Sequence, residues 1–221
     1  MKKQKPKILL LTGLGVNHRF LAPYKLYARM RGWQCDMVDN STFATNNVKK
    51  YVDELKSSID QHDGECILIG FSLGGIASAY LAATSREYNS KIKKIYTICS
   101  PLQGANDLIV QNQVLQYLIG IPIPDDILPN MLVTLRELGR EFTYKIPAKK
   151  IGFAKKVHNK VTAFFHRNDM IAPAGMSYFD GMNKVEIPYS YSIIPRVLHH
   201  HIACADPRLF LRIFKEIRKE F

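Results

Sequence analysis

The stretch from residue 66 to residue 81, CILIGFSLGGIASAYL, holds the pattern that decides the fold. Its first part is an apolar run typical of a buried strand, and its second part is a small-residue segment of helical spacing. A GxSxG motif, Gly70 to Gly74 with Ser72 at its centre, joins the two. A serine on so tight a turn has strained backbone geometry, so the flanking positions must lack side chains that would clash. The pattern predicts that Ser72 is a nucleophile; a structural glycine-rich turn is the alternative.

Short apolar runs alternate with longer segments of helical spacing along most of the chain. The expected strands are 8–12, 34–38, 66–70, 94–99, 161–166 and 185–194, and the expected helices are 21–31, 46–61, 73–87 and 207–220. This order is typical of a mostly parallel sheet joined by crossover helices. We therefore predict an α/β fold, with a single domain over residues 1–221, a mostly parallel central sheet of about six strands and helices on both faces.

One segment, residues 102–156, breaks this alternation because it is far longer than an ordinary connection. It contains two apolar helical pieces, 108–119 and 125–142, and ends in a lysine-rich tail. Long inserts in a compact domain are usually functional. We expect a lid-like helical insert. Its apolar faces either cover a site and bind an acyl chain or pack onto the sheet, and the sequence alone leaves both open.

The composition limits both the class of protein and its partners. Of the 221 residues, 47% are hydrophobic and 23% are charged, which excludes a disordered chain and fits one globular domain. A formal net charge of +12 favours an anionic partner, which can be nucleic acid, acidic lipid or an acidic ligand. The basic residues follow no recognisable DNA- or RNA-binding motif, so nucleic acid is disfavoured. Peripheral contact with an anionic membrane through the lysine-rich tail is our hypothesis.

The cysteines and the amino terminus bear on the compartment. The four cysteines lie far apart, three of them in apolar runs, which argues against a disulfide framework and favours buried thiols in a reducing compartment. Residues 1–11 imitate a secretory signal, but Gly13 and Gly15 break the apolar run and no cleavage site follows it. No stretch approaches the roughly 20 apolar residues of a transmembrane helix. We expect a soluble, cytoplasmic protein.

A nucleophilic serine needs a histidine base and a carboxylate that orients the base, in the chain order serine, acid, histidine. Asp169 is the favoured acid because it follows the strand 161–166, at the edge where sites collect in open α/β sheets. Asp180, in a glycine-containing loop, is the second choice. Asp206 is expected to cap the last helix, just before Pro207.

The tract His199-His200-His201 precedes the last helix, and only one of its members can serve as the base of Ser72. Consecutive side chains rarely converge on one ion, and no CxxC or HExxH motif accompanies the tract. We therefore predict neither a metal site nor a cofactor. The residues alone do not decide which of the three histidines is the base.

An oxyanion hole is the remaining requirement. One N–H should come from the residue after the nucleophile and another from the loop after the first strand, which are Leu73 and Leu14 here. The loop 12–15 allows close approach of the backbone to a substrate, and it contains neither GxGxxG nor GxxxxGK[ST], so nucleotide binding is disfavoured. The residues expected to contact the substrate are Gly13, Gly15, His18, Phe71 and Leu102.

These motifs resemble those of the α/β-hydrolase superfamily and, within it, the small lipases and esterases with a reduced sheet. The likeness covers nearly the whole chain. It is carried by residues 12–15 (TGLG), 70–75 (GFSLGG), 99–104 (CSPLQG), 168–173 (NDMIAP) and 201–207 (HIACADP). The chain departs from the family at Thr12-Gly13, where a His-Gly pair is frequent.

The resemblance implies Ser72 as nucleophile and Asp169 as acid, together with the two oxyanion amides named above. It favours His201 as the base, with His200 as the alternative, because the catalytic histidine of similar lipases directly precedes a short apolar stretch.

The resemblance also implies an activity, that of a serine esterase or lipase. Such an enzyme cleaves carboxylic esters of small molecules or lipids through an acyl-enzyme intermediate. Three alternatives stay open: a thioesterase with the same triad, an acyltransferase with the same triad, and a non-catalytic lipid-binding protein of this fold.

Overall fold

The computed structural model describes residues 5–13, 18–38, 48–103, 154–169, 172, 174–188, 200, 202–203 and 206–221. Its strands are β1 (Lys7–Leu11), β2 (Cys35–Met37), β3 (Cys66–Phe71), β4 (Ile92–Ile98), β5 (Val161–Phe165) and β6 (Asn183–Glu186). Its helices are η1 (His18–Leu21), α1 (Ala22–Met30), α2 (Val48–Asp60), α3 (Leu73–Thr84), α4 (Arg86–Lys91), α9 (Lys155–His158), η4 (Ala174–Met176) and α11 (Pro207–Glu220).

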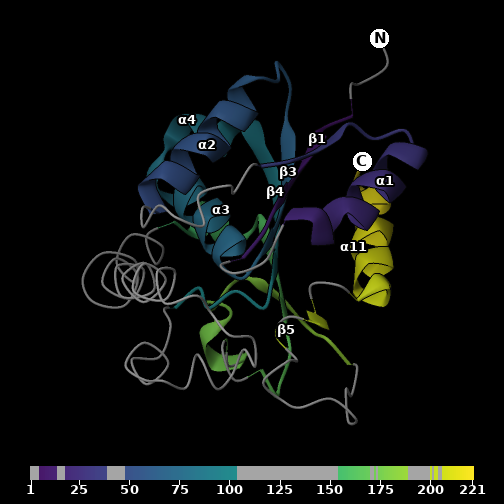
Figure 1. Cartoon of the computed structure of the whole chain (residues 1–221). Helices are drawn as coiled ribbons and strands as arrows, with labels where there is room; N and C mark the ends of the chain where they lie inside the picture. The colour runs from purple at the N-terminus through teal and green to yellow at the C-terminus, as the bar shows by residue number, and fades with distance from the viewer. Residues whose placement is uncertain are drawn as a thin grey trace, which may run out of the picture.

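The six strands form one sheet in the order β2-β1-β3-β4-β5-β6, and every neighbouring pair is parallel. Figure 1 shows α2, α3 and α4 on one face of this sheet and α1 and α11 on the other. The predicted α/β fold, with a parallel central sheet and helices on both faces, is confirmed. β3, which leads into the GxSxG motif, lies in the interior of the sheet and all its residues are buried.

The inner strands β1, β3, β4 and β5 are mostly apolar and buried because helices cover both faces of the sheet. Successive side chains of β1 alternate between two hydrophobic cores. Ile8 and Leu10 pack in the core with residues of α1 and α11, whereas Leu9 and Leu11 pack in the core with residues of α2 and α3. This double burial fixes the position of the strand ends, where the candidate site lies.

Helix α11 covers its face of the sheet with an apolar stripe. Asp206 stands before the helix and accepts a hydrogen bond from the backbone N–H of Arg208 at 2.8 Å, and Pro207 occupies the first turn. The predicted cap is therefore confirmed. The buried residues of the helix are Leu209, Phe210, Ile213, Phe214 and Ile217, which is the face that the periodicity predicts.

Most elements lie within two residues of their predicted ends, but the helix after Ser72 and the last strand differ from the predictions. The helix expected over 73–87 is interrupted, because Ser85 takes extended backbone and its side chain accepts a hydrogen bond from the N–H of Tyr88, which starts α4. The last strand, expected over 185–194, begins earlier: β6 covers Asn183–Glu186, and residues 189–194 lie outside the described part of the chain.

Most of the predicted insert, residues 104–153, lies outside the described residues, so the lid stays a prediction. At its two ends the structure describes Leu102, which is buried, and α9, which contains Lys155 and Lys156 of the lysine-rich tail. Within the ranges given above, no helix combines the length and the apolar character that crossing a membrane requires.

Three of the four cysteines are buried free thiols, as predicted: Cys35, Cys66 and Cys99. Burial raises the pKa of Cys35 and of Cys66 to about 12, so both thiols stay protonated and unreactive at neutral pH. Cys204 lies outside the described residues.

Replacing Asp206 by alanine should destabilise the protein, because the first turn of α11 loses the carboxylate that accepts from the N–H of Arg208. We expect a loss of about 1–2 kcal/mol in the free energy of unfolding, measured by urea denaturation. Asp63→Ala, which removes the same charge from an exposed bend, is the matched control and should change stability by less than about 0.5 kcal/mol. Equal losses in the two variants would contradict the capping role.

Candidate active site

Ser72 occupies a sharp turn between β3 and α3, with φ 49° and ψ −116°. Such backbone geometry is strained for a residue with a side chain. The turn is held through its own backbone, because the N–H of Ser72 donates to the carbonyl of Ile98 at 2.9 Å and its carbonyl accepts from the N–H groups of Gly75 and Ile76. Ser72 thus lies at the end of a buried strand and directly before the N-terminus of α3.

The glycines around Ser72 are required by close backbone approaches. A Cβ atom on Gly74 would lie 2.7 Å from the carbonyl oxygens of Leu11 and Thr12, and one on Gly70 would collide with the backbone of Gly74 and Gly75. Neither obstacle is a flexible side chain that could move away. The motif glycines therefore allow the first turn of α3 to rest directly against the sheet.

Gly13, in the loop after β1, comes equally close to the serine. A Cβ atom added there would lie 2.8 Å from the Cβ of Ser72. A larger residue at this position would therefore fill the space beside the serine side chain. Gly13 is buried next to Ser72.

A chain of hydrogen bonds connects Ser72 to a histidine and a carboxylate. The Oγ of Ser72 lies 3.0 Å from Nε2 of His200, and Nδ1 of His200 lies 2.8 Å from Oδ2 of Asp169. Both His200 and Asp169 are buried. When Asp169 is ionised, it accepts a hydrogen bond from the Nδ1–H of the neutral His200 ring. Nε2 of the ring then has no proton and can accept a hydrogen bond from the serine hydroxyl.

The turn after β5 fixes the orientation of Asp169. Its other carboxylate oxygen, Oδ1, accepts from the backbone N–H of Ala172 at 2.8 Å, and its own N–H donates to the carbonyl of His166 at 3.1 Å. The two carboxylate oxygens thus have separate partners, one in the local turn and one in His200. The carboxylate is held in place before any substrate binds.

The histidine that meets Ser72 is His200, and this corrects the preference for His201. His200 makes the hydrogen bonds to both Ser72 and Asp169. His199 and His201 themselves lie outside the described residues. The ring of Phe71 packs against His200 with centroids 5.0 Å apart, which holds the imidazole from the side of β3.

Only some of the other predicted site residues lie in the described part of the chain. Leu73 is buried and begins α3, so its N–H belongs to the positive end of that helix. Leu14 and Gly15 lie outside the described residues, and of His18 only the backbone, in η1, is described. Asp180 takes no part in the triad: its carbonyl contacts Nδ1 of His158 at 3.0 Å.

Cys99 is a site residue that the sequence did not single out. It follows β4 and, with Ser72, is one of the two non-glycine residues of positive φ among those described. Its Sγ and the donor atoms of Asp169 and His200 all lie within 4.8 Å of one another. Cysteine, aspartate and histidine are ligands that Zn²⁺ accepts, but here Asp169 and His200 use their facing atoms to bind each other. In the sequence, the one indication of this position is that Cys99 follows β4, the strand between β3 and β5.

Comparison with known proteins begins with two negative results: no family model matches the chain, and no curated protein matches it. Several solved structures, in contrast, are similar to this chain. A carboxylesterase of the ammonia-oxidizing thaumarchaeon Nitrososphaera gargenis has a TM-score of 0.69 at 13% identity, over 99% of this chain and 93% of its own. MGS-MChE2, an α/β-hydrolase enzyme from a sediment metagenome of the lagoon of Mar Chica, Morocco, has a TM-score of 0.61 at 15% identity, over 100% and 94%.

The chain has the α/β-hydrolase fold. A thermophilic esterase from Thermogutta terrifontis shares this fold with a TM-score of 0.60 at 11% identity, over 98% of this chain and 90% of its own. Identities this low establish the architecture, and an architecture does not fix an activity. The activity has to be argued from the side chains at the carboxyl edge of the sheet.

Replacing Gly74 by alanine should destabilise the protein, because the new Cβ would overlap backbone atoms of Leu11 and Thr12. We expect a loss of about 1–3 kcal/mol in the free energy of unfolding, measured by urea denaturation. The matched control is Gly175→Ala, where no atom lies within 4 Å of the added Cβ and no change larger than about 0.5 kcal/mol is expected. If both variants were as stable as the parent protein, the close contact of α3 with the sheet would be wrong.

Proposed function

We propose that this protein is a serine hydrolase that cleaves carboxylic ester bonds, with Ser72 as nucleophile, His200 as base and Asp169 as the group that orients the base. The observation that carries the proposal is the unbroken hydrogen-bond chain from Asp169 through His200 to Ser72. Its three members come from separate parts of the sequence, and each follows the order that this fold requires. The esterases among the structural neighbours support the same reaction class.

In the first step, Oγ of Ser72 attacks the ester carbonyl while Nε2 of His200 takes the hydroxyl proton. The ring then carries a positive charge, which the buried carboxylate of Asp169 stabilises through Nδ1. His200 returns the proton to the leaving alcohol, and Ser72 is left as an acyl ester. A water molecule, activated by the same imidazole, releases the acid and restores the serine.

The tetrahedral intermediate needs donors for its oxyanion. The N–H of Leu73 lies at the start of α3, where the helix dipole and the amide both favour negative charge. The N–H of Leu14 is the second donor that the sequence predicts. The strained turn at Ser72 supports this role, because it holds the hydroxyl and the first amide of the helix next to each other.

Replacing Ser72 by alanine should abolish hydrolysis, because the variant lacks the hydroxyl that contacts Nε2 of His200 and attacks the ester carbonyl. We expect turnover of p-nitrophenyl butyrate to fall by about 10⁶-fold, or to the limit of detection, with an unchanged circular dichroism spectrum. A panel of p-nitrophenyl esters of increasing chain length, with a matching thioester, measures the substrate class in the same assay. Near-normal ester hydrolysis by Ser72→Ala would overturn the proposal.

The histidine tract offers a matched pair of variants. His200→Ala should lower turnover by at least about 10⁴-fold, because it removes the base and the link to Asp169. His201→Ala changes the adjacent residue in the same way and should retain activity within about threefold, since His200 makes both hydrogen bonds of the triad. The reverse result, with His201→Ala inactive and His200→Ala active, would transfer the role of base to His201.

A further inference from the structure

The large apolar side chains that the described residues expose are gathered on one layer of the molecule. They are Phe20 (59% exposed), Leu26 (62%), Met30 (76%), Leu211 (50%) and Phe221 (40%). The first four lie in η1, α1 or α11, and Phe221 directly follows α11. Scattered exposed apolar residues are ordinary, but a concentration on one side marks an interaction surface.

The helices α1 and α11 form that layer together. Tyr24 and Tyr27 of α1 pack against Phe210 at ring-centroid distances of 4.0 and 5.0 Å, and Figure 1 shows the two helices side by side on the same face of the sheet. We call the outer side of η1, α1 and α11 the α1–α11 surface. It lies on the opposite side of the sheet from α2, α3 and α4.

The outward face of α1 is apolar, which reverses the usual pattern of a surface helix. Tyr24 and Ala28 point into the core and satisfy the need for burial. Leu26 and Met30, one turn apart, stand on the exposed side with Pro23. Exposure of this stripe to water does not stabilise the fold, because the buried residues on the other face already hold the helix against the sheet.

Basic residues outnumber acidic ones around the stripe. Between His18 and Gln34 there is no aspartate or glutamate, whereas Arg19, Lys25, Arg29 and Arg31 are all present. On α11 the exposed basic residues are Arg208, Arg212, Lys215, Arg218 and Lys219. The acidic residues of α11 are Glu216 and Glu220, and Glu220 forms an ion pair with Lys94.

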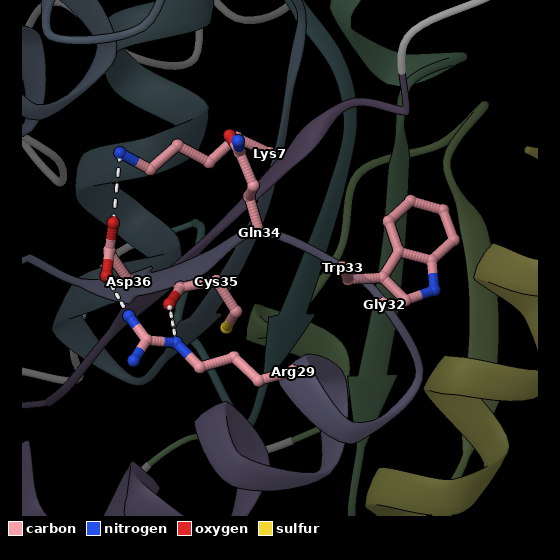
Figure 2. A pocket seen from close by; sticks show the side chains of 7 residues that line it. All are labelled: Lys7, Arg29, Gly32, Trp33, Gln34, Cys35 and Asp36. Atoms are coloured by element: carbon pink, nitrogen blue, oxygen red, sulfur yellow. Dashed lines mark hydrogen bonds and ion pairs between the residues drawn. The ribbon is translucent and has the colours of Figure 1, made fainter. Parts of the chain in front are cut away.

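The end of α1 borders a cavity of about 630 Å³ that carries an excess of positive charge. Figure 2 shows Lys7 and Arg29 reaching Asp36 across this cavity, and Lys25 pairs with the same carboxylate at 3.2 Å. Partial burial would raise the pKa of Asp36, but hydrogen bonds from Lys7 and Lys25 outweigh it and hold the pKa below its ordinary value. One carboxylate therefore faces three cations, and the surplus charge stays available to an anion.

From this combination we propose that the α1–α11 surface docks the protein on an anionic lipid bilayer. Phe20, Leu26 and Met30 enter the boundary between headgroups and acyl chains, and the basic residues around them contact lipid phosphates. Each basic residue near such a surface strengthens binding by roughly fivefold, so a cluster of this size suffices for peripheral attachment at moderate salt. The proposal concerns a surface away from the Ser72 triad and does not depend on the proposed catalysis.

A second copy of the chain is the less favoured occupant of the same surface. Two identical α1–α11 surfaces would bring a majority of arginine and lysine against the same majority, with only Glu216 and Glu220 of α11 as acidic residues to pair them. An anionic bilayer matches both the apolar stripe and the sign of the charge. This match is what commits the surface to lipid.

The test is co-sedimentation of the full chain with vesicles at about 0.1 M salt. Vesicles of phosphatidylcholine with roughly 30% phosphatidylserine should bind the protein at least tenfold more tightly than pure phosphatidylcholine, and added salt should release it. Leu26→Glu with Met30→Glu should reduce binding by at least tenfold. Leu26→Ser with Met30→Ser, which leaves the charge unchanged, should also weaken it by several-fold.

The matched control is Ser57→Glu with Gln61→Glu, which adds the same negative charge at exposed positions at the end of α2, on the other face of the sheet. This control should bind anionic vesicles like the parent protein. All variants should keep the parent circular dichroism spectrum and melting temperature, so that loss of binding cannot be assigned to unfolding. Parent-like binding by the Leu26/Met30 variants would overturn the proposal. So would equal binding to neutral and anionic vesicles, or a dimer by sedimentation velocity that only these variants abolish.

Discussion

The close contact between the first turn of α3 and the sheet is the constraint on which the candidate site depends. Gly70 and Gly74 have no side chains, so the backbone of α3 approaches β1 and β3 to distances that no other residue allows. Ser72 is forced into positive φ as a result, at a conformational cost of about 1–3 kcal/mol. The surrounding cores hold it there, since β3 is buried throughout and most of α3 is buried as well.

Parallel topology then supplies the partners of Ser72. Because β3, β4 and β5 are neighbours in the sheet and all run the same way, their carboxyl ends meet at one edge. Ser72, Cys99 and Asp169 each follow one of these strands, and His200 joins them from 31 residues beyond Asp169. The arrangement places a polar, buried hydrogen-bond chain at the edge of an otherwise apolar sheet. Outside a reaction, such a chain would be a costly feature to maintain.

The sequence could predict those parts of the site that are tied to strand ends. Ser72 and Asp169 could be predicted in this way, because a motif or an apolar run fixes where each strand stops. The histidine that meets Ser72 could not, because three consecutive histidines differ only in side-chain direction, and direction is set by tertiary packing. The likeness to lipases favours His201 because it directly precedes a short apolar stretch, and His201 is one residue beyond the histidine that reaches Ser72.

Two further features needed the structure. Cys99 lies far from Asp169 and His200 in the sequence, and its proximity to them follows only from strand order. In α1 the apolar residues lie around most of the helix, so periodicity does not tell Tyr24, which is buried, from Leu26, which is exposed. Strand positions were more predictable than helix faces, because both sides of the sheet are covered and the inner strands are therefore rich in apolar residues.

The proposed hydrolysis requires that Ser72 is a nucleophile activated by His200. Reaction of the folded protein with a fluorophosphonate, followed by peptide mass mapping, tests it directly, because this probe reports only a serine with an activated hydroxyl. We expect one adduct, on Ser72, which is lost in His200→Ala and kept in His201→Ala. An unlabelled protein, or an adduct on another residue with Ser72 unmodified, would contradict this role of Ser72.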